Sequence, residues 1–230
     1  MDTERTNHQR IVVRRDVLAD DRVSASEQHS KWTERGTLVV NLVSSPGAGK
    51  TALLEATAKH LHQRYSMAVL VGDLETDRDA QRLSPWTQVA QLTTGGACHL
   101  QLSLVCRGVQ ALGDPQVDFL FIENIGNLVC PASRALGEHL RVVVLSVTEG
   151  DDKPGKYPKM FRTSHALIVS KIDLLPYVPF DVASAVEDAR LIQPNLISMQ
   201  LSSLTGHGIA DWCKYLETSR QQLLKTSKKK

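Results

Sequence analysis

Residues 44–51 read Ser-Ser-Pro-Gly-Ala-Gly-Lys-Thr and directly follow an apolar run at residues 37–43. This order predicts a buried strand, a turn of small residues and a helix that begins with Lys-Thr, which is the layout of a phosphate-binding loop. Such a turn points successive backbone N–H groups inward, where they and the positive end of the following helix can hold a triphosphate. The residues expected to line the phosphates are Ser45, Pro46, Gly47, Ala48, Gly49, Lys50 and Thr51.

The two polar residues that end this loop have separate predicted roles. Lys50 is expected to bridge the outer phosphates, and the Thr51 hydroxyl is expected to bind Mg²⁺. Ser44 stands where the usual pattern has glycine, so the segment is a close variant of the pattern rather than a full match. A short Gly-x-Gly-Lys string also occurs in ordinary strand-to-helix turns, so the loop alone leaves that reading open.

A second nucleotide signal lies downstream, where the apolar run 166–169 ends in Ser-Lys-Ile-Asp at residues 170–173. The carboxylate of Asp173 can accept two hydrogen bonds from the N1–H and N2 amino groups of guanine, which adenine does not offer. The aliphatic stem of Lys171 is expected to lie over the ring plane. By themselves, Lys171 and Asp173 also fit a solvated charge pair at a strand end.

A third segment supports the guanine reading. Residues 202–206 read Ser-Ser-Leu-Thr-Gly and follow the strand-like residues 196–201. They suit a loop whose backbone amide meets the guanine carbonyl, so Ser203 and Leu204 are predicted base contacts. The order and spacing of the three segments favour a nucleotide site over a charge pair.

Acidic residues follow two further apolar runs. Asp73 comes at the end of the run 68–71, and Glu123 comes directly after residues 117–122. Acidic residues at the carboxyl ends of parallel strands face the crevice where ligands bind, so both are candidates for the magnesium shell, directly or through water. Gly126 would let a backbone amide approach the γ-phosphate. Asp73 also suits a helix cap, because the residues after it look helical.

A different set of residues suggests a transition metal. Cys98 and His99 follow Thr-Thr-Gly-Gly-Ala, and Cys130 lies a few residues beyond Gly126. Thiolate and imidazole ligands together suit Zn²⁺ and Ni²⁺. The spacing alone does not decide the matter, because free cysteines often pack as small apolar residues. That packing is the expectation for Cys106 and Cys213.

Six segments together resemble the HypB family, the nickel-incorporation GTPases of [NiFe]-hydrogenase maturation. They are residues 44–51, residues 72–80 with Gly-Asp, Thr76 and Asp-Ala in place, Gly-Gly-Ala-Cys-His-Leu at 95–100, Ile-Glu-Asn-Ile-Gly-Asn-Leu-Val-Cys-Pro-Ala at 122–132, Leu-Ser-Val-Thr-Glu-Gly-Asp-Asp-Lys-Pro at 145–154 and Lys-Ile-Asp-Leu-Leu-Pro at 171–176. The likeness runs from about residue 17 to about residue 216.

The resemblance implies a GTP-hydrolysing protein for nickel insertion, with Mg²⁺ at Thr51, Asp73 and Glu123 and with Lys153 among the nucleotide-binding residues. It also implies that Cys98, His99 and Cys130 form a nickel or zinc site at a nucleotide-dependent homodimer interface. The implied partners are the hydrogenase large-subunit precursor and other nickel-insertion accessory proteins such as HypA. Many relatives carry an N-terminal cysteine motif or histidine-rich store, but residues 1–36 contain no cysteine and only two histidines, His8 and His29.

Three alternatives remain at this point. One is a metal-binding scaffold with guanine nucleotide as a slow conformational ligand, since the sequence shows no obvious hydrolytic glutamine or arginine finger. Another is a urease-type nickel GTPase of the UreG family, although that family carries a Cys-Pro-His motif where this chain has Cys-Pro-Ala. The third is a partitioning-type ATPase, which usually carries lysine where Ser45 stands.

Composition and element spacing predict an α/β fold with a mostly parallel sheet, helices on both faces and phosphate-loop NTPase architecture. The expected parts are an N-terminal polar extension and helix at 1–36, a GTPase domain with the metal site at 37–224 and a basic tail at 225–230. With 42% hydrophobic and 23% charged residues and a net charge of +2, the chain reads as an ordinary cytoplasmic protein with neither a nucleic-acid nor a membrane partner.

Overall fold

The protein is a single seven-stranded parallel sheet covered by helices on both faces, within the residues that the structure describes. The computed structural model describes the backbone of residues 17–73 and 78–227, and the side chains of residues 22–72 and 79–227. The strands are β1 (Leu38–Ser44), β2 (Met67–Asp73), β3 (Gln88–Thr93), β4 (Phe119–Glu123), β5 (Leu140–Ser146), β6 (Ala166–Ser170) and β7 (Ile197–Gln200).

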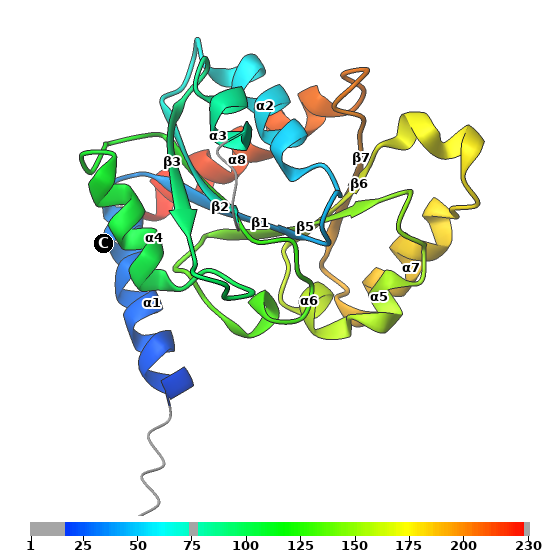
Figure 1. The fold of residues 1–230 in the computed structure, drawn as a ribbon, viewed down its shortest axis with the longest axis horizontal. Helices are drawn as coiled ribbons and strands as arrows, with labels where there is room; N and C mark the ends of the chain where they lie inside the picture. The colour runs from blue at the N-terminus through cyan, green and yellow to red at the C-terminus, as the bar shows by residue number, and fades with distance from the viewer. Residues whose placement is uncertain (1–16, 74–77, 228–230) are drawn as a thin grey trace, which may run out of the picture.

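The strand order of the sheet is β3-β2-β4-β1-β5-β6-β7, so β1 lies at its centre (Figure 1). All neighbouring pairs are parallel. In the register, Leu42 of β1 faces Glu123 of β4 and Ser44 faces Val144 of β5. The carboxyl ends of β1, β4, β5 and β6 therefore meet along one edge of the sheet, where ligands bind in open α/β folds.

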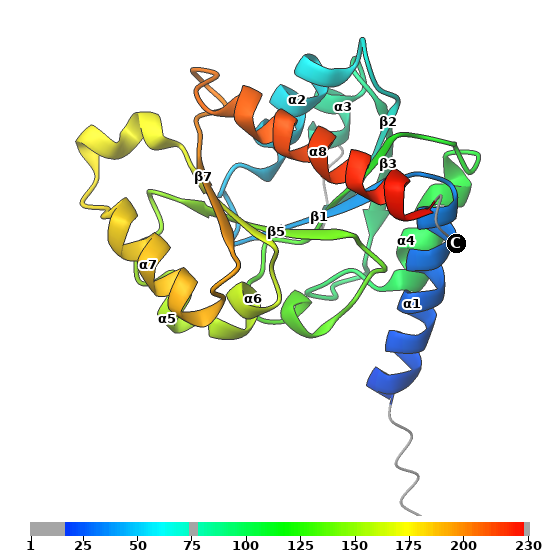
Figure 2. The same cartoon turned by 180° about the vertical axis from the view of Figure 1, so that it is seen from behind.

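The helices connect these strands and form two layers (Figures 1 and 2). They are α1 (Val17–Glu34), α2 (Lys50–Leu61), α3 (Arg78–Leu83), α4 (Leu102–Ala111), α5 (Lys153–Lys156), α6 (Pro158–Arg162), α7 (Val182–Ile192) and α8 (Ile209–Ser227), with short 3₁₀ helices η1 (Pro131–Ser133) and η2 (Ile172–Tyr177). One face of the sheet packs on α2 and α8, and the other packs on α1, α4, α6 and α7.

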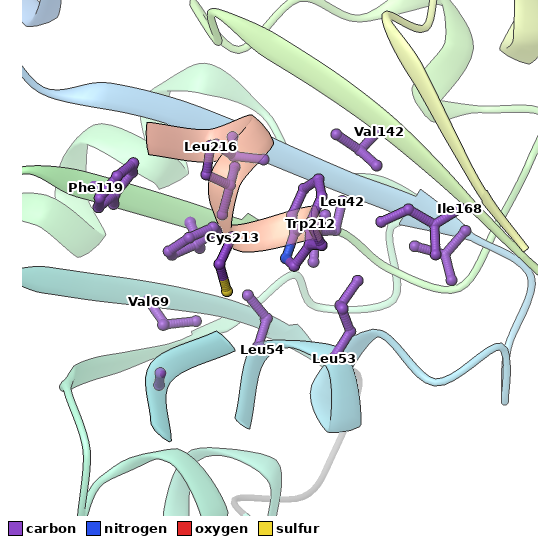
Figure 3. Close-up of a cluster of buried hydrophobic side chains, with 14 of the residues drawn as sticks. Leu42, Leu53, Leu54, Val69, Phe119, Val142, Ile168, Trp212, Cys213 and Leu216 are labelled. Carbon is purple, nitrogen blue, oxygen red and sulfur yellow. The ribbon is translucent and has the colours of Figure 1, made fainter. Parts of the chain in front are cut away.

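The strands alternate their side chains between the two layers, as a period of two requires. Leu38, Val40 and Leu42 of β1 join the core beneath α2 and α8, whereas Val39 and Val43 face the opposite layer. Figure 3 shows Trp212 of α8 among Leu42, Leu53 and Leu54, in the centre of the first core. Its indole Nε1–H donates to the Thr57 hydroxyl at 2.9 Å, so the ring is buried without an unpaired donor.

The α/β fold expected from the sequence is confirmed, with small shifts in the element ends. The helix expected within residues 1–36 is α1, and α2 begins at Lys50, as expected for the helix that starts with Lys-Thr. Strand β3 was not predicted from the sequence. Its burial explains this, because three of its six residues are half-buried and two are exposed, and the edge position removes the continuous apolar run of an inner strand.

The two cysteines that were expected to pack in the core differ. Cys213 of α8 is 1% exposed and lies in the core between α8 and the sheet, and burial raises the pKa of its thiol to about 12. Cys106 of α4 is only half-buried, so the expected packing is confirmed only in part for it. Helix α4 contacts α1. Partial burial raises the pKa of the Cys106 thiol as well.

Helix α1 is held to the amino edge of the sheet by a neutral histidine. Thr33 donates its hydroxyl proton to the His29 carbonyl at 2.8 Å, so the 3.0 Å contact with His139 must use a proton on His139 Nε2. The other ring nitrogen, Nδ1, accepts the Val39 N–H at 2.9 Å. Burial, followed by the nearby His29 ring, lowers the pKa of His139 to about 4.

None of the helices in the described part of the chain combines the length and the apolar character needed to cross a membrane.

Because His139 is neutral in the folded protein, we expect the stability of the fold to decrease in acid. The folded-state pKa of about 4 lies below the ordinary value of 6.5, so the unfolded chain binds more protons between these values. The stabilising contribution is complete above about pH 6.5 and is lost as the pH falls towards 4. From pH 7 to pH 5, we expect the free energy of unfolding to fall by about 2 kcal/mol through this group.

Urea denaturation of the wild type and of His139→Gln at both pH values measures this loss. The glutamine cannot titrate, so the variant should lose about 2 kcal/mol less than the wild type between pH 7 and pH 5. His165, whose pKa burial also lowers, remains in both proteins and cancels in the difference. Equal losses in the two proteins would show that His139 is not the sensitive group.

Candidate functional site

The predicted phosphate loop connects the end of β1 to the start of α2. Gly47 and Gly49 adopt φ values of 74° and 97°, in the left-handed region that favours glycine, and helix α2 begins at Lys50. Lys50 is 7% exposed, and its ammonium donates to the Ser44 hydroxyl at 2.9 Å. The loop therefore keeps its backbone curvature and its cation together at the carboxyl edge of the sheet.

The segment after β4 lies tightly against this loop. A Cβ atom on Gly126 would sit 2.8 Å from the backbone N and Cα of Pro46, which is closer than a side chain tolerates. The Thr51 hydroxyl donates to Glu123 Oε1 at 2.7 Å. The structure thus brings Thr51, Glu123 and Gly126 together, because β1 and β4 are paired neighbours.

These residues suit a hard cation beside a phosphate. A hydroxyl and a carboxylate are oxygen ligands of the kind that Mg²⁺ prefers, usually with several waters and with phosphate oxygens. Asp73, the other predicted magnesium ligand, ends β2 next to β4, but its side chain lies outside the described residues. Thr76 of the same segment also lies outside them.

The predicted base-binding segment is joined to the phosphate loop from the other side. The Ser170 hydroxyl donates to the Ala48 carbonyl at 2.7 Å, and the Lys171 ammonium donates to the Gly47 carbonyl at 2.6 Å. Lys171 has a φ of 59°, a turn that places the half-buried Asp173 on η2 just beyond it. The Ser-Lys-Ile-Asp segment therefore lies beside the loop that it was predicted to accompany.

The remaining predicted nucleotide residues lie further out. Ser203 and Leu204 are in the turn after β7, which meets the base-binding segment through a 3.4 Å hydrogen bond from Ile172 N–H to the Leu201 carbonyl. Leu204 is 85% exposed. Lys153 begins α5, where its ammonium lies 5.5 Å from the centroid of the Tyr157 ring.

The three predicted metal ligands converge although they come from two separate loops. One donor atom each from Cys98, His99 and Cys130 lies within 4.8 Å of the others. Cys98 Sγ is 3.7 Å from His99 Nδ1, and the adjacent Cys130 thiol raises the pKa of Cys98. Asn127 shapes the second loop by accepting the N–H groups of Val129 and Cys130 at 2.7 and 3.3 Å.

The donor set fits a tetrahedral metal ion. Two sulfur ligands of such an ion, each with a bond of about 2.3 Å, are about 3.8 Å apart, which is within the spread of this cluster. Two thiolates and one imidazole are ligands that Zn²⁺ and Ni²⁺ share. Cys98 is exposed and the other two residues are half-buried, so a further ligand can approach from outside.

Sequence reasoning missed a group of buried polar residues that lies between these sites. Asn41 in β1, Asn124 after β4, and the ion pair of Glu138 with Arg141 form one hydrogen-bonded chain. Burial alone would raise the pKa of Glu138, but the Arg141 charge and hydrogen bonds from Leu136 N–H and Asn41 outweigh it and hold the pKa below its ordinary value. The available signal was a polar residue inside each of two apolar strands, at positions 41 and 141.

Comparison with known proteins agrees with this geometry. The family model for the CobW/HypB/UreG nucleotide-binding domain matches residues 38–200. The chain is 43% identical over 206 residues to the hydrogenase maturation factor HypB of Escherichia coli (strain K12), covering 89% of this chain and 71% of that relative. It is 40% identical over 221 residues to the hydrogenase/urease maturation factor HypB of Helicobacter hepaticus, covering 94% and 90%.

A solved structure extends the likeness from sequence to fold. HypB from Helicobacter pylori in complex with nickel superimposes with a TM-score of 0.83 and 38% identity, covering 88% of this chain and 96% of that one. Sequence identity of this size over most of both chains shows common family membership as well as a shared fold. The chain belongs to the HypB family, within the CobW/HypB/UreG group of nucleotide-binding proteins.

Proposed function

We propose that this protein is a GTP-hydrolysing metallochaperone that inserts nickel into [NiFe]-hydrogenase. One observation carries the proposal most directly: residues 123–130 contribute both to the phosphate site, through Glu123 and Gly126, and to the three-donor metal cluster, through Cys130. A nucleotide-dependent change in this segment would reach a metal ligand within four residues of Gly126. The names of the relatives, hydrogenase maturation factors, supply the client.

Hydrolysis of GTP in this proposal rests on positioning and charge. Phosphoryl transfer needs the spreading negative charge to be neutralised, which Lys50 and a magnesium ion held at Thr51, Glu123 and Asp73 would do. The Gly126 amide would meet the γ-phosphate. Asp173 would select guanine, with Lys171 over the base and with Lys153, Ser203 and Leu204 around it.

Nickel is the cargo of the cluster formed by Cys98, His99 and Cys130, and zinc suits the same donors. Three ligands leave a position for water, for a second copy of the chain or for a client protein. We propose a nucleotide-dependent homodimer that joins at this face, with the hydrogenase large-subunit precursor and accessory proteins such as HypA as partners. Residues 37–224 would form the GTPase domain and residues 225–230 a basic tail, in the cytoplasm.

One observation favours a second client. The relative from Helicobacter hepaticus is named a hydrogenase/urease maturation factor, and it is similar to this chain over nearly its whole length. Delivery of nickel to a urease is therefore a second candidate use of the same site.

A slowly cycling metal scaffold is the other alternative, and steady-state turnover at saturating GTP distinguishes it from an enzyme.

Replacing Lys50 tests the enzymatic part. Lys50→Ala removes the cation that would neutralise the outer phosphates, so we expect GTP turnover to fall below detection while the fold is retained. Phosphate release is the measurement, with circular dichroism as the check on folding. Lys59→Ala is the matched control, because this lysine lies on the same helix at its surface, where it pairs with Glu55 and lies over the Trp86 ring. Normal turnover in Lys50→Ala would refute the assignment.

Replacing Asp173 tests base selection. Asp173→Asn loses an acceptor for the N1 and N2 donors of guanine, and two charge-assisted hydrogen bonds are worth about 3 kcal/mol, or roughly 100-fold in affinity. The new amide donor should improve binding of xanthine nucleotides, which carry a carbonyl at that position. Titration with fluorescent GTP and XTP analogues measures both changes. Asp211→Asn, at an exposed site in the first turn of α8, should leave both affinities unchanged, and unaltered GTP binding in Asp173→Asn removes that residue from the base pocket.

Replacing Cys130 tests the metal site. Cys130→Ala should abolish nickel binding at the cluster and the nucleotide effect on nickel affinity, while GTP still binds. In the wild type, we expect nickel affinities in the GDP and GTP-analogue states to differ by roughly 5- to 150-fold, and nickel must change the ratio of GTP-analogue to GDP affinity by the same factor. Competition with a chelator under anaerobic conditions measures these values. Cys106→Ala, outside the cluster, is the control, and equal nickel affinity in the two wild-type states would contradict the coupling.

A further inference from the structure

A buried polar chain joins the two metal-binding loops through the centre of the sheet, and the chemistry proposed above does not use it. Asn41, Asn124 and Arg141 are 0%, 2% and 6% exposed, and the Glu138 side chain is 6% exposed. Polar groups at such depth are costly unless each finds a partner. Their partners show what the chain connects.

The first end of the chain holds the loop of Cys98 and His99. Asn124 Oδ1 accepts the N–H of Leu100 at 3.3 Å and the N–H of Ile125 at 3.0 Å. Leu100 directly follows His99 and is fully buried. Asn124 itself directly follows Glu123, which binds Thr51 of the phosphate loop. A single carboxamide therefore lies between the nucleotide segment and the first metal loop.

The second end holds the loop that follows Cys130. Asn124 Nδ2 donates to Asn41 Oδ1 at 3.2 Å, and Asn41 Nδ2 donates to Glu138 Oε1, also at 3.2 Å. Glu138 accepts two hydrogen bonds from Arg141, from Nε at 2.9 Å and from Nη2 at 2.6 Å. Arg141 in turn donates to the carbonyls of Ala132 and Arg134, just beyond Cys130.

The direction of every bond in this chain is determined by its ends. Backbone N–H groups can only donate, so the Asn124 atom beside Leu100 and Ile125 must be its oxygen. The Glu138 carboxylate, kept ionised by Arg141, can only accept, so the Asn41 atom beside it must be its nitrogen. Neither carboxamide can flip without leaving buried groups unpaired, so the chain resists separate rearrangement of its members.

The two ends of the chain are attached to different parts of the molecule. Asn41 is fixed inside the central strand, and Arg141 ties the 132–134 turn to the neighbouring strand β5. The Asn124 N–H also donates to the Leu42 carbonyl of β1 at 3.0 Å, but Asn124 lies two residues before Gly126, which touches the phosphate loop. A shift of residues 125 and 126 towards a γ-phosphate would move the Asn124 carboxamide, which accepts the Ile125 N–H, and with it Leu100 and His99, whereas residues 132–134 would stay with the sheet.

We propose that Asn124 and Asn41 are positioning residues of the nucleotide-gated metal site, which set how far the Cys98-His99 loop moves relative to Cys130 when GTP replaces GDP. The inference rests on the proposed function and deepens it, since it names the residues that convert the nucleotide state into metal affinity. Neither carboxamide touches the metal donors themselves. Both act through the backbone that carries them.

The variant Asn41→Val tests this role away from both ligands. Valine keeps the size and strand preference of the site but removes both hydrogen bonds, so Asn124 loses its fixed partner. We expect the ratio of nickel affinities between the GDP and GTP-analogue states to fall at least threefold towards one, while the affinities for GDP and GTP stay within twofold of the wild type. The control is Thr57→Val, which removes a buried hydroxyl that binds Trp212 on the opposite face of the sheet and should keep the full ratio.

Hydrogen exchange of the wild type gives a second readout that needs no variant. The Leu100 amide, which donates to Asn124, should change its protection at least threefold between the GDP and GTP-analogue states, together with the Ile125 amide. Equal protection of the Leu100 amide in the two states overturns the proposal. This result does not depend on whether Asn41→Val folds. A folded Asn41→Val with the full wild-type ratio overturns it too.

The outcomes separate this inference from the proposed function. Retained coupling in Asn41→Val removes the positioning role and leaves a nickel-binding GTPase in place. A wild type that binds no nickel at Cys98, His99 and Cys130, or that does not hydrolyse GTP, refutes the proposed function and the inference with it.

Discussion

The arrangement of the whole site depends on the parallel pairing of β1 with β4 on one side and with β5 on the other. This register places Glu123 beside Leu42, and thus within reach of Thr51 in the first turn of α2. The further pairing of β5 with β6 brings Ser170 to the carbonyl of Ala48. A shift of one residue in any of these pairs would turn the side chains to the opposite face and separate the site.

The same sheet ends in two chemically different edges. At the amino edge, His139 and His165 are neutral and accept backbone N–H groups from Val39 and Arg141, which closes the edge without charge. At the carboxyl edge, Lys50, Glu123 and Lys171 bring charges next to the phosphate loop. The sheet also holds the buried ion pair of Glu138 and Arg141. Removing either partner would leave an unpaired charge in the interior, at a cost of about 3–5 kcal/mol in stability.

Much of this architecture could be read from the sequence, because it depends on local patterns. The phosphate loop, the inner strands and the final helix follow from runs of apolar residues and from small residues at fixed spacing. The convergence of Cys98, His99 and Cys130 was inferred from the family resemblance, since their spacing alone also allowed simple packing. Strand β3 and the contacts of Asn41 could not be predicted, because an edge strand lacks a continuous apolar run and a polar residue in a strand does not reveal its partner across the sheet.

The hydrogen bond between Lys50 and Ser44 has a consequence for how fast and how tightly a phosphate can be held. A free lysine side chain loses up to about 2 kcal/mol of rotamer entropy when it becomes fixed. Here the ammonium is already confined within the loop at 2.9 Å from the Ser44 hydroxyl. Most of this rotamer entropy is therefore lost during folding, before any ligand binds. Association then exchanges one partner of the ammonium for another, and the side chain needs no separate search for its bound conformation.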